Sequence, residues 1–147
     1  MELNQKSQST AYNRYPEIFK EVKTIIVSSG AVGLGMGKLG LTERPSNLAV
    51  LRACAAIGQC CLMNAWTDAL AKVDLMPGQV LLTRQDFADH QRSQKVKETL
   101  SNLTCRKIVP IVNENDSVSD EEIKFGDNDV LSALLCSLTG AELLIIL

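Results

Sequence analysis

Short apolar segments alternate with longer amphipathic ones along most of this chain. Four runs of β-branched and aliphatic side chains, each bounded by Gly, Pro or polar residues, occupy residues 24–27, 79–83, 108–112 and 143–147. Such runs are typical of strands that are buried on both faces of a sheet. Longer segments with apolar residues at helical spacing separate them. The pattern therefore predicts an α/β fold in which helices cover both faces of a parallel sheet.

A long apolar helix is predicted over about residues 47–73, between the first two strands. Its apolar side chains recur at helical spacing, and Pro45 followed by Asn47 is a start signal for a helix. Small residues in its middle, Cys54 and Gly58, would let another backbone approach closely. Close packing of the helix explains these small residues better than a catalytic or binding role does.

Two further helices are expected, one charged over about residues 89–103 and one over residues 130–138 that ends at Gly140 as a C-cap. The strand at residues 108–112 contains Pro110, which has no amide hydrogen to donate. A proline of this kind predicts an edge strand or a bulge.

Composition and charge restrict the class of protein. The 147 residues are 46% hydrophobic and 22% charged, which is typical of one globular domain or part of one. A net charge of -2 provides no field to gather nucleic acid or anionic lipid, so neither partner is expected. Residues 1–23 contain no signal-peptide core, and the longest uncharged runs, at residues 24–37 and 53–67, are too short and polar to span a bilayer.

The five cysteines predict that the protein resides in a reducing compartment. The single histidine argues against a histidine-based zinc site. The cysteines form no Cys-x-x-Cys pair, and four lie in apolar stretches as buried reduced thiols do, so a cytoplasmic protein is expected. His90 has no second histidine nearby, so a histidine-based zinc site has little support. We expect His90 at a solvated helix position.

A glycine-rich turn is expected after the first strand. Residues 35–40 match Gly-x-Gly-x-x-Gly, but the strand ends about six residues earlier, which argues against a nicotinamide or flavin site. Leu39 stands where a P-loop needs Ser or Thr to bind magnesium, so this is not a P-loop. Residues 28–31 are better placed, because backbone amides at a strand-to-helix junction, with the Ser29 hydroxyl, can bind a carboxylate or phosphate. A simple turn with serine as a helix cap is the alternative.

Two later loops concentrate short amide and carboxylate side chains. They contain Asn113, Asn115, Asp116, Asp127, Asn128 and Asp129. A helix cap needs one residue, whereas three candidates stand in a row before the last helix. Because clustered carboxylates repel one another, an ammonium-bearing substrate or a divalent cation would explain the surplus. Capping and turn formation are the alternative explanation.

Five segments carry a resemblance to a known family. They are residues 26–32 (IVSSGAV), 55–59 (AAIGQ), 79–83 (QVLLT), 109–116 (VPIVNEND) and 124–133 (KFGDNDVLSA). In this order they resemble the amino acid kinase family and, within it, the branch that phosphorylates glutamate. The resemblance covers about residues 24–147. The pair of motifs Asn-Glu-Asn-Asp (residues 113–116) and Gly-Asp-Asn-Asp (residues 126–129) distinguishes this branch from the carbamate kinase, aspartokinase and uridylate kinase relatives.

The resemblance implies an αβα sandwich with a mainly parallel sheet, of which this chain is an incomplete part. It implies transfer of the γ-phosphoryl group of ATP, with Mg²⁺, to the side-chain carboxylate of L-glutamate, the first step of proline biosynthesis. Proline is implied as a feedback inhibitor, and the full-length protein as a homo-oligomer. Phosphoryl transfer depends on aligning two anions and neutralising their charge more than on a covalent group from the protein.

The resemblance also implies roles for individual residues. Ser29, Asp116 and Asn128 match glutamate-binding positions of the family, with Gly30 and Asn113 beside them. Asp127 and Asp129 match acidic positions near the phosphoryl-transfer centre, where a lysine or magnesium would be their partner. No side chain of this chain is expected to be a resident metal ligand.

The chain departs from the family at its beginning, because residues 1–23 contain no strand with the lysine that contacts the phosphates in family members. We expect residues 1–23 to be a divergent N-terminal segment and residues 24–147 to be the glutamate-binding half of the kinase domain, without the nucleotide-binding half. A strand at residues 143–147 should lead into a further loop and helix, so we expect a piece of a longer protein. The alternative function is a non-catalytic module that binds glutamate or proline.

Overall fold

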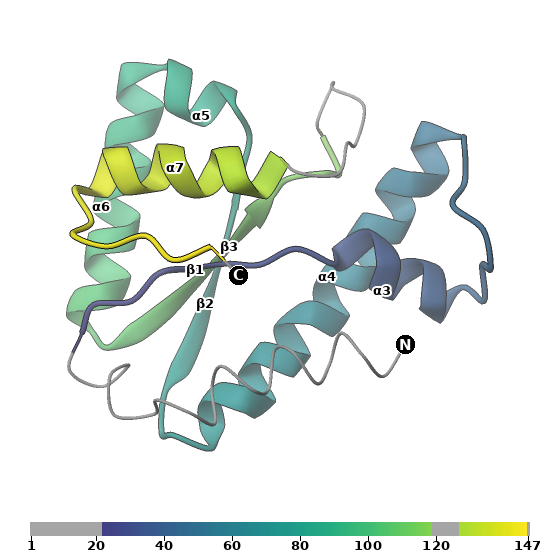
Figure 1. Cartoon of the computed structure of the whole chain (residues 1–147), viewed down its shortest axis with the longest axis horizontal. Helices are drawn as coiled ribbons and strands as arrows, with labels where there is room; N and C mark the ends of the chain where they lie inside the picture. The colour runs from purple at the N-terminus through teal and green to yellow at the C-terminus, as the bar shows by residue number, and fades with distance from the viewer. Residues whose placement is uncertain (1–21, 119–126, 147) are drawn as a thin grey trace.

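The computed structural model describes residues 22–118 and 127–146. Its elements, in chain order, are β1 (Ile26–Val27), α3 (Ala31–Lys38), α4 (Leu48–Ala71), β2 (Met76–Leu82), α5 (Gln85–Ala88), α6 (His90–Cys105), β3 (Ile108–Glu114) and α7 (Asp127–Thr139). The described strands form one parallel sheet in the order β1-β3-β2, with helices on both of its sides (Figure 1). This confirms the predicted α/β class with a parallel sheet.

Strand β3 separates two apolar layers, because successive side chains of a strand point to opposite faces of the sheet. One layer joins β3 to α4 through Leu62, Trp66, Leu70, Val109 and Ile111. The other joins the opposite face to α6 and α7 through Leu82, Leu100, Val112, Leu131 and Leu135. Figure 1 shows α3 and α4 on one side of the sheet and α5, α6 and α7 on the other. The arrangement is the predicted αβα sandwich.

The predicted edge position of the proline-containing strand is wrong, because β3 is the central strand. Its pairing with β1 begins where Ile26 lies opposite Ile111. The Val112 carbonyl accepts a hydrogen bond from the Ser28 amide at 2.9 Å, so even-numbered residues of β3 direct their backbone groups toward β1. Pro110 therefore faces β1 just before that pairing begins. Its missing amide hydrogen interrupts no bond of the ladder, and a proline is tolerated in a central strand.

The strand boundaries also differ from those expected. β1 has two residues, and β2 begins at Met76, so the expected turn residues Pro77 and Gly78 belong to the strand. The expected strand at residues 143–147 is wrong for its described part: residues 143–146 form no strand, and their side chains are 41% to 74% exposed. An aliphatic run becomes a strand only where a neighbouring strand accepts its hydrogen bonds.

The glycine-rich turn predicted after β1 is mostly the helix α3, which packs tightly against α4. A Cβ atom on Gly35 would lie 1.8 Å from the Cys54 carbonyl oxygen, and one on Gly58 would lie 1.7 Å from that of Ala31. The two backbones therefore touch at these glycines, as the small residues of the long helix predicted. Glycine is unfavourable inside a helix by propensity, and close packing is the reason for it here.

Helix α4 begins where the sequence predicted, because the Asn47 side chain accepts hydrogen bonds from the amides of Ala49 and Val50. By length and composition alone, α4 is long and apolar enough to cross a membrane. In the structure Leu62 and Leu70 are fully buried in the layer between α4 and the sheet. The packing of a core helix explains the same apolar composition.

The remaining helices follow the expected order. The charged helix α6 begins at His90, which is exposed as predicted, and the Asp89 side chain caps it. The four-residue α5 was not predicted, because it is too short for periodicity to reveal. Gly140 follows α7 at φ 69° and donates to the Cys136 carbonyl, which confirms the predicted C-cap.

The cysteines are free thiols, as expected, but full burial is confirmed for Cys54 alone, and Cys61 and Cys136 are half-buried. Cys60 and Cys105 are exposed. Both exposed thiols lie on outer faces of helices, where an apolar stretch of sequence does not imply a buried position.

Candidate functional site

Three polar segments that are far apart in the sequence meet beyond the carboxyl ends of β1 and β3. The Asn128 side chain, in the first turn of α7, donates to Ser29 Oγ at 2.6 Å and to Asn113 Oδ1 at 3.0 Å. Ser29 follows β1, and Asn113 lies near the end of β3. Ligands of open parallel sheets bind at this edge, where loops and helix amino ends converge. The structure therefore brings together three of the residues that the sequence selected.

The two serines after β1 have different surroundings. Ser28 is buried, its amide continues the ladder to β3, and its hydroxyl accepts a hydrogen bond from Trp66 Nε1 at 2.9 Å. Ser29 is exposed. Ser28 therefore ties the loop to α4, and Ser29 is the hydroxyl available to a ligand.

Gly30 connects β1 to α3 in a conformation that favours glycine. Its φ is 110°, which a residue with a side chain rarely adopts. Gly30 is also the N-cap of α3, and no side chain caps that helix end by a hydrogen bond. The first amides of α3 thus face the same loop as Ser29. Unsatisfied amides at a helix amino end favour an anion.

Asn113 is the centre of a larger set of amides. Its Nδ2 donates to Gln59 Oε1 at 3.0 Å, and its Oδ1 also accepts from the Glu114 amide at 2.9 Å. Gln59 in turn donates to Gln79 Oε1 at 3.4 Å. We call Gln59, Gln79, Asn113 and Asn128 the amide cluster. Asn113 is 3% exposed and Gln59 is 8% exposed, so the centre of the cluster is shielded from water.

Gln59 and Gln79 were missed as functional candidates. Both stand in segments that carried the family resemblance, but a single glutamine on a mostly apolar helix or strand indicates nothing by itself. The available signal was that Gln59 directly follows Gly58, in the part of α4 whose small residues predict close packing. A polar side chain at such a position is expected to be buried. A buried amide needs partners, and the partners come from other elements.

The acidic residues lie around this cluster. Asp116 is half-buried in the turn that follows β3, and the Asn115 amide donates to the Leu82 carbonyl at 2.8 Å, which continues the pairing with β2. Asp129 is exposed in the first turn of α7. Asp127 is the first residue of α7, but its side chain lies outside the described part of the chain, as does the whole of residues 119–126. A carboxylate in a first helical turn is favoured by the helix dipole.

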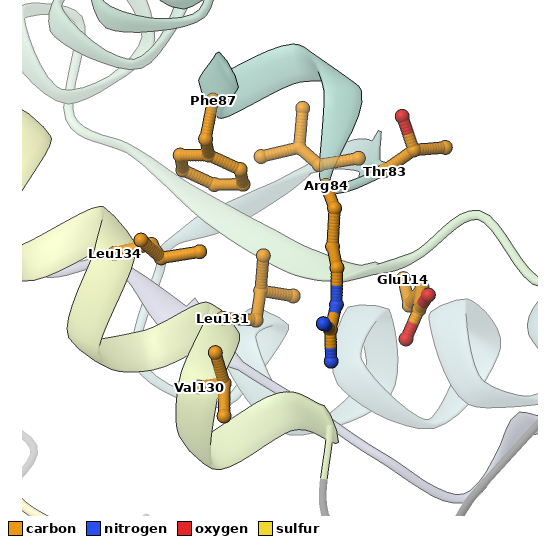
Figure 2. A pocket seen from close by; sticks show the side chains of 8 residues that line it. Thr83, Arg84, Phe87, Glu114, Val130, Leu131 and Leu134 are labelled. Atoms are coloured by element: carbon orange, nitrogen blue, oxygen red, sulfur yellow. The ribbon is translucent and has the colours of Figure 1, made fainter. Parts of the chain in front are cut away.

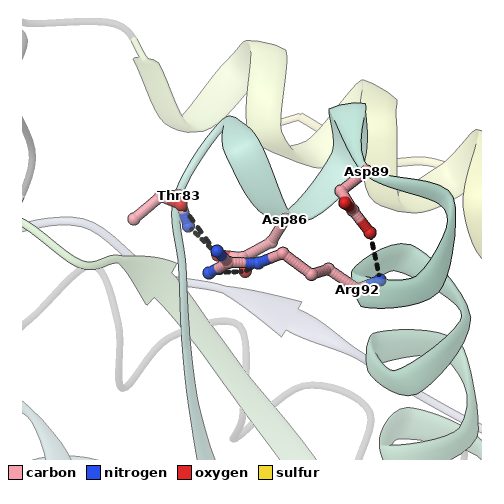
Figure 3. Close-up of polar contacts among 4 residues, drawn as sticks. All are labelled: Thr83, Asp86, Asp89 and Arg92. Carbon is pink, nitrogen blue, oxygen red and sulfur yellow. Dashed lines mark hydrogen bonds and ion pairs between the residues drawn. The ribbon is translucent and has the colours of Figure 1, made fainter.

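A second polar cluster lies beyond β2, and it is built around charged side chains (Figure 3). Asp86 accepts hydrogen bonds from the amide and hydroxyl of Thr83 at 2.7 and 2.8 Å and from Arg92 Nε at 2.8 Å. Asp89 accepts from the Arg92 amide at 2.9 Å. We call Thr83, Asp86, Asp89 and Arg92 the carboxylate cluster. Burial raises the pKa of Asp86, but the hydrogen bonds from Thr83 and then the Arg92 guanidinium outweigh it, so the pKa is lowered overall.

A small pocket opens where the ends of β2 and β3 meet α5 and α7 (Figure 2). It is lined by Leu82, Thr83, Arg84, Phe87, Glu114, Val130, Leu131 and Leu134. Its walls are mostly apolar, with Arg84 and Glu114 as the charged members. An apolar wall offers nothing to the carboxylates and the ammonium group of an amino acid. The loops around the amide cluster are therefore the better candidate site.

The described residues contain no group of three His, Cys, Asp or Glu side chains close enough to hold a metal ion. Magnesium is commonly held by one or two carboxylates together with substrate phosphates and water.

Comparisons with known proteins show which family the chain resembles. The model of the amino acid kinase family matches residues 9–147. A protein of Meiothermus ruber named glutamate 5-kinase is 53% identical over 125 residues, which are 85% of this chain and 33% of that protein. One of Caldanaerobacter subterraneus is 50% identical over 128 residues (87% and 34%), and one of Clostridium acetobutylicum is 49% identical over 126 residues (86% and 47%), both with that name.

The chain thus spans between a third and a half of the length of these relatives. The family model, in contrast, covers nearly all of the chain, including every described element of the sheet and of the candidate site. By this match and by its parallel αβα architecture, the chain belongs to the amino acid kinase family.

Proposed function

We propose that this chain forms the glutamate-binding part of a glutamate 5-kinase. The reaction would transfer the γ-phosphoryl group of ATP to the side-chain carboxylate of L-glutamate. The observation that carries this proposal is the hydrogen-bonded meeting of Ser29, Asn113 and Asn128 from three separate segments. Relatives at about 50% identity that carry the name support it.

The site has the chemistry that an amino acid head group requires. Glutamate offers two carboxylates as acceptors and one ammonium group as its only donor. The Ser29 hydroxyl and the amides at the start of α3, after Gly30, suit a carboxylate. The half-buried carboxylate of Asp116 suits the ammonium group. Asn113 and Asn128 hold the loops that present these groups.

Phosphoryl transfer would take place at the adjacent end of α7. The carboxylate oxygen of glutamate would form a bond to the γ-phosphorus while the bond from that phosphorus to the bridging oxygen of ADP breaks. We assign Asp127 and Asp129 to the surroundings of this centre, where carboxylates orient cationic groups. Magnesium, when bound with the phosphates of ATP, would neutralise part of their charge.

Further parts of the proposal concern the whole protein. We propose that residues 1–23 form a divergent segment and residues 24–147 the glutamate-binding half of the kinase domain. The intact protein would act in the cytoplasm, in proline biosynthesis, as a homo-oligomer. Proline would inhibit it at a site overlapping that for glutamate, since proline shares the carboxylate and the charged nitrogen of the substrate.

The experiment is a transfer assay on the intact protein with L-glutamate, ATP and Mg²⁺. The product is an acyl phosphate, which hydroxylamine traps as a hydroxamate. Ser29→Ala should raise the KM for glutamate, and the matched exposed change Ser101→Ala on α6 should not. Glutamate binding without hydroxamate would favour the non-catalytic module. Absence of glutamate binding would overturn the proposal.

A further inference from the structure

We propose that Gln59 of α4 is a positioning residue, which acts through Asn113 to orient the side-chain amide of Asn128 toward the substrate ammonium group. The inference rests on the proposed glutamate site and adds a residue that does not touch the substrate. It follows from the direction of each hydrogen bond in the amide cluster.

The direction is determined by a backbone group. An amide side chain has one donor end and one acceptor end, and exchanging them reverses every contact it makes. The backbone amide of Glu114 can only donate, and it donates to Asn113 Oδ1 at 2.9 Å. The acceptor end of Asn113 is thereby fixed, and its donor end, Nδ2, is left to face Gln59 Oε1 at 3.0 Å.

Asn128 must then present its donor end to Asn113. Its Nδ2 lies 3.0 Å from Asn113 Oδ1 and 2.6 Å from Ser29 Oγ. Its Oδ1 consequently points away from Asn113, where it is buried and has no hydrogen-bond partner among the residues that the structure describes. A buried acceptor without a partner is costly, and a ligand that brings a donor removes the cost. The ammonium group is the only donor that glutamate has, so we assign it to Asn128 Oδ1.

Gln59 holds this arrangement because it occupies the donor end of Asn113. Without an acceptor at position 59, Asn113 Nδ2 would be buried without a partner, since Asn113 is 3% exposed. The Glu114 amide would still hold the acceptor end of Asn113, but the donor end would be drawn out of this position toward another acceptor. The bond from Asn128 Nδ2 to Asn113 Oδ1 would then be weakened. The Glu114 amide thus sets the direction of Asn113, and Gln59 of α4 holds Asn113 in the position from which it orients Asn128 in α7.

The first experiment needs no substrate. In the intact protein, selective ¹⁵N labelling would resolve the side-chain amide protons of Asn113 and Asn128. Gln59→Met keeps the length of the side chain and removes its acceptor, so hydrogen exchange of the Asn128 amide protons should rise by about tenfold or more. Gln94→Met, the same change at an exposed position of α6, should leave that exchange rate unchanged. An unchanged exchange rate in Gln59→Met would overturn the proposal.

The second experiment identifies the ligand group concerned. Glutarate is glutamate without its amino group, so the ratio of the affinities for glutamate and glutarate reports the contribution of the ammonium contact. Gln59→Met should lower this ratio by about tenfold, with the KM for ATP unchanged. Gln59→Glu retains an acceptor oxygen for Asn113 but loses the donor to Gln79, so it should restore part of the ratio. A purely structural role would weaken both ligands equally, and that result would contradict the proposal.

The two experiments separate the possible failures. If the wild-type protein binds no glutamate, the proposed function is wrong, and the exchange rates still decide whether Gln59 orients Asn128. If glutamate binds but the ratio is the same in Gln59→Met as in the wild type, the proposed function stands and the role of Gln59 is wrong.

Discussion

The two polar clusters at the carboxyl edge of the sheet are held together by different interactions. The amide cluster, which runs from β2 and α4 through the end of β3 to the start of α7, consists of neutral side chains whose central members are buried. The carboxylate cluster, beyond β2, depends on the ion pair of Asp86 with Arg92, whose side chain is 52% exposed. Neutral amides cost less to bury than charges and have a direction that does not change with pH.

This difference suits different tasks. A buried network of amides can hold one orientation next to a ligand, because every reversal leaves a buried group without a partner. A charged cluster near the surface connects β2 to α5 and α6, but solvent and salt weaken it. We therefore expect changes in the amide cluster and its surroundings to alter glutamate recognition, and changes in the carboxylate cluster to alter stability.

The largest effect is expected from Asp116, which would supply the charge that the neutral amides lack. Asp116→Ala should weaken glutamate binding by roughly 2 to 5 kcal/mol, because the substrate ammonium group loses its partner in a partly closed site. Calorimetric titration of the intact protein with glutamate and with ATP measures this. An equal loss for both ligands would indicate a folding defect instead.

Asp129 tests whether the acidic residues at α7 act in transfer. Asp129→Asn should lower kcat by about 10²-fold, because charge near the transferring group is lost, with a smaller change in glutamate affinity. Asp127→Asn should behave in the same way. Steady-state kinetics with varied glutamate separates the two parameters. If either variant changed only the affinity for glutamate, that residue would belong to the binding site and not to the transfer centre.

The amide cluster itself can be broken at its centre. Asn113→Leu would leave the Glu114 amide, Gln59 Oε1 and Asn128 Nδ2 without their present partner, and should lower the free energy of unfolding by about 1 to 3 kcal/mol. Urea denaturation measures the change. Asn102→Leu, on the exposed face of α6, is the matched control and should change stability by less than about 0.5 kcal/mol. Equal values for the two variants would mean that the buried amides contribute nothing.

The smallest effect is expected in the carboxylate cluster, and it should depend on pH. The pKa of Asp86 is lower in the folded protein than its ordinary value of 3.8, so its stabilisation is present above that value and is lost as pH falls through the folded pKa. Asp86→Asn should be about 1 kcal/mol less stable than the wild type at pH 7. The difference should shrink below about pH 4. Denaturation midpoints at pH 7 and pH 3 measure it, and a difference that does not change with pH would contradict this reasoning.

Much of the architecture could be predicted from the sequence, for identifiable reasons. The alternation of short aliphatic runs with amphipathic segments predicted the parallel sheet and the helices on both of its faces. Asn47 and Gly140 marked helix ends through local chemistry that needs no distant partner. Cys54 and Gly58 predicted the close approach of a second backbone, and α3 provides it.

The errors occur where a partner far along the chain decides the outcome. Pro110 predicts an edge strand by itself, but the short β1 lets it stand in the central one. Residues 143–146 have the composition of a strand and no strand partner in the described structure. The glycines after β1 predict a turn, whereas packing against α4 makes the segment a helix.

The same distinction between local and distant partners applies to the candidate site. The residue types at Ser29, Asn113 and Asn128, and their position after strands, were evident in the sequence, because the backbone places the ends of parallel strands at one edge. Their contact, the burial of Gln59 and the direction of each amide depend on four elements meeting in space. An amide side chain looks the same in a sequence whichever way it points, and only its neighbours in the tertiary structure determine which end donates.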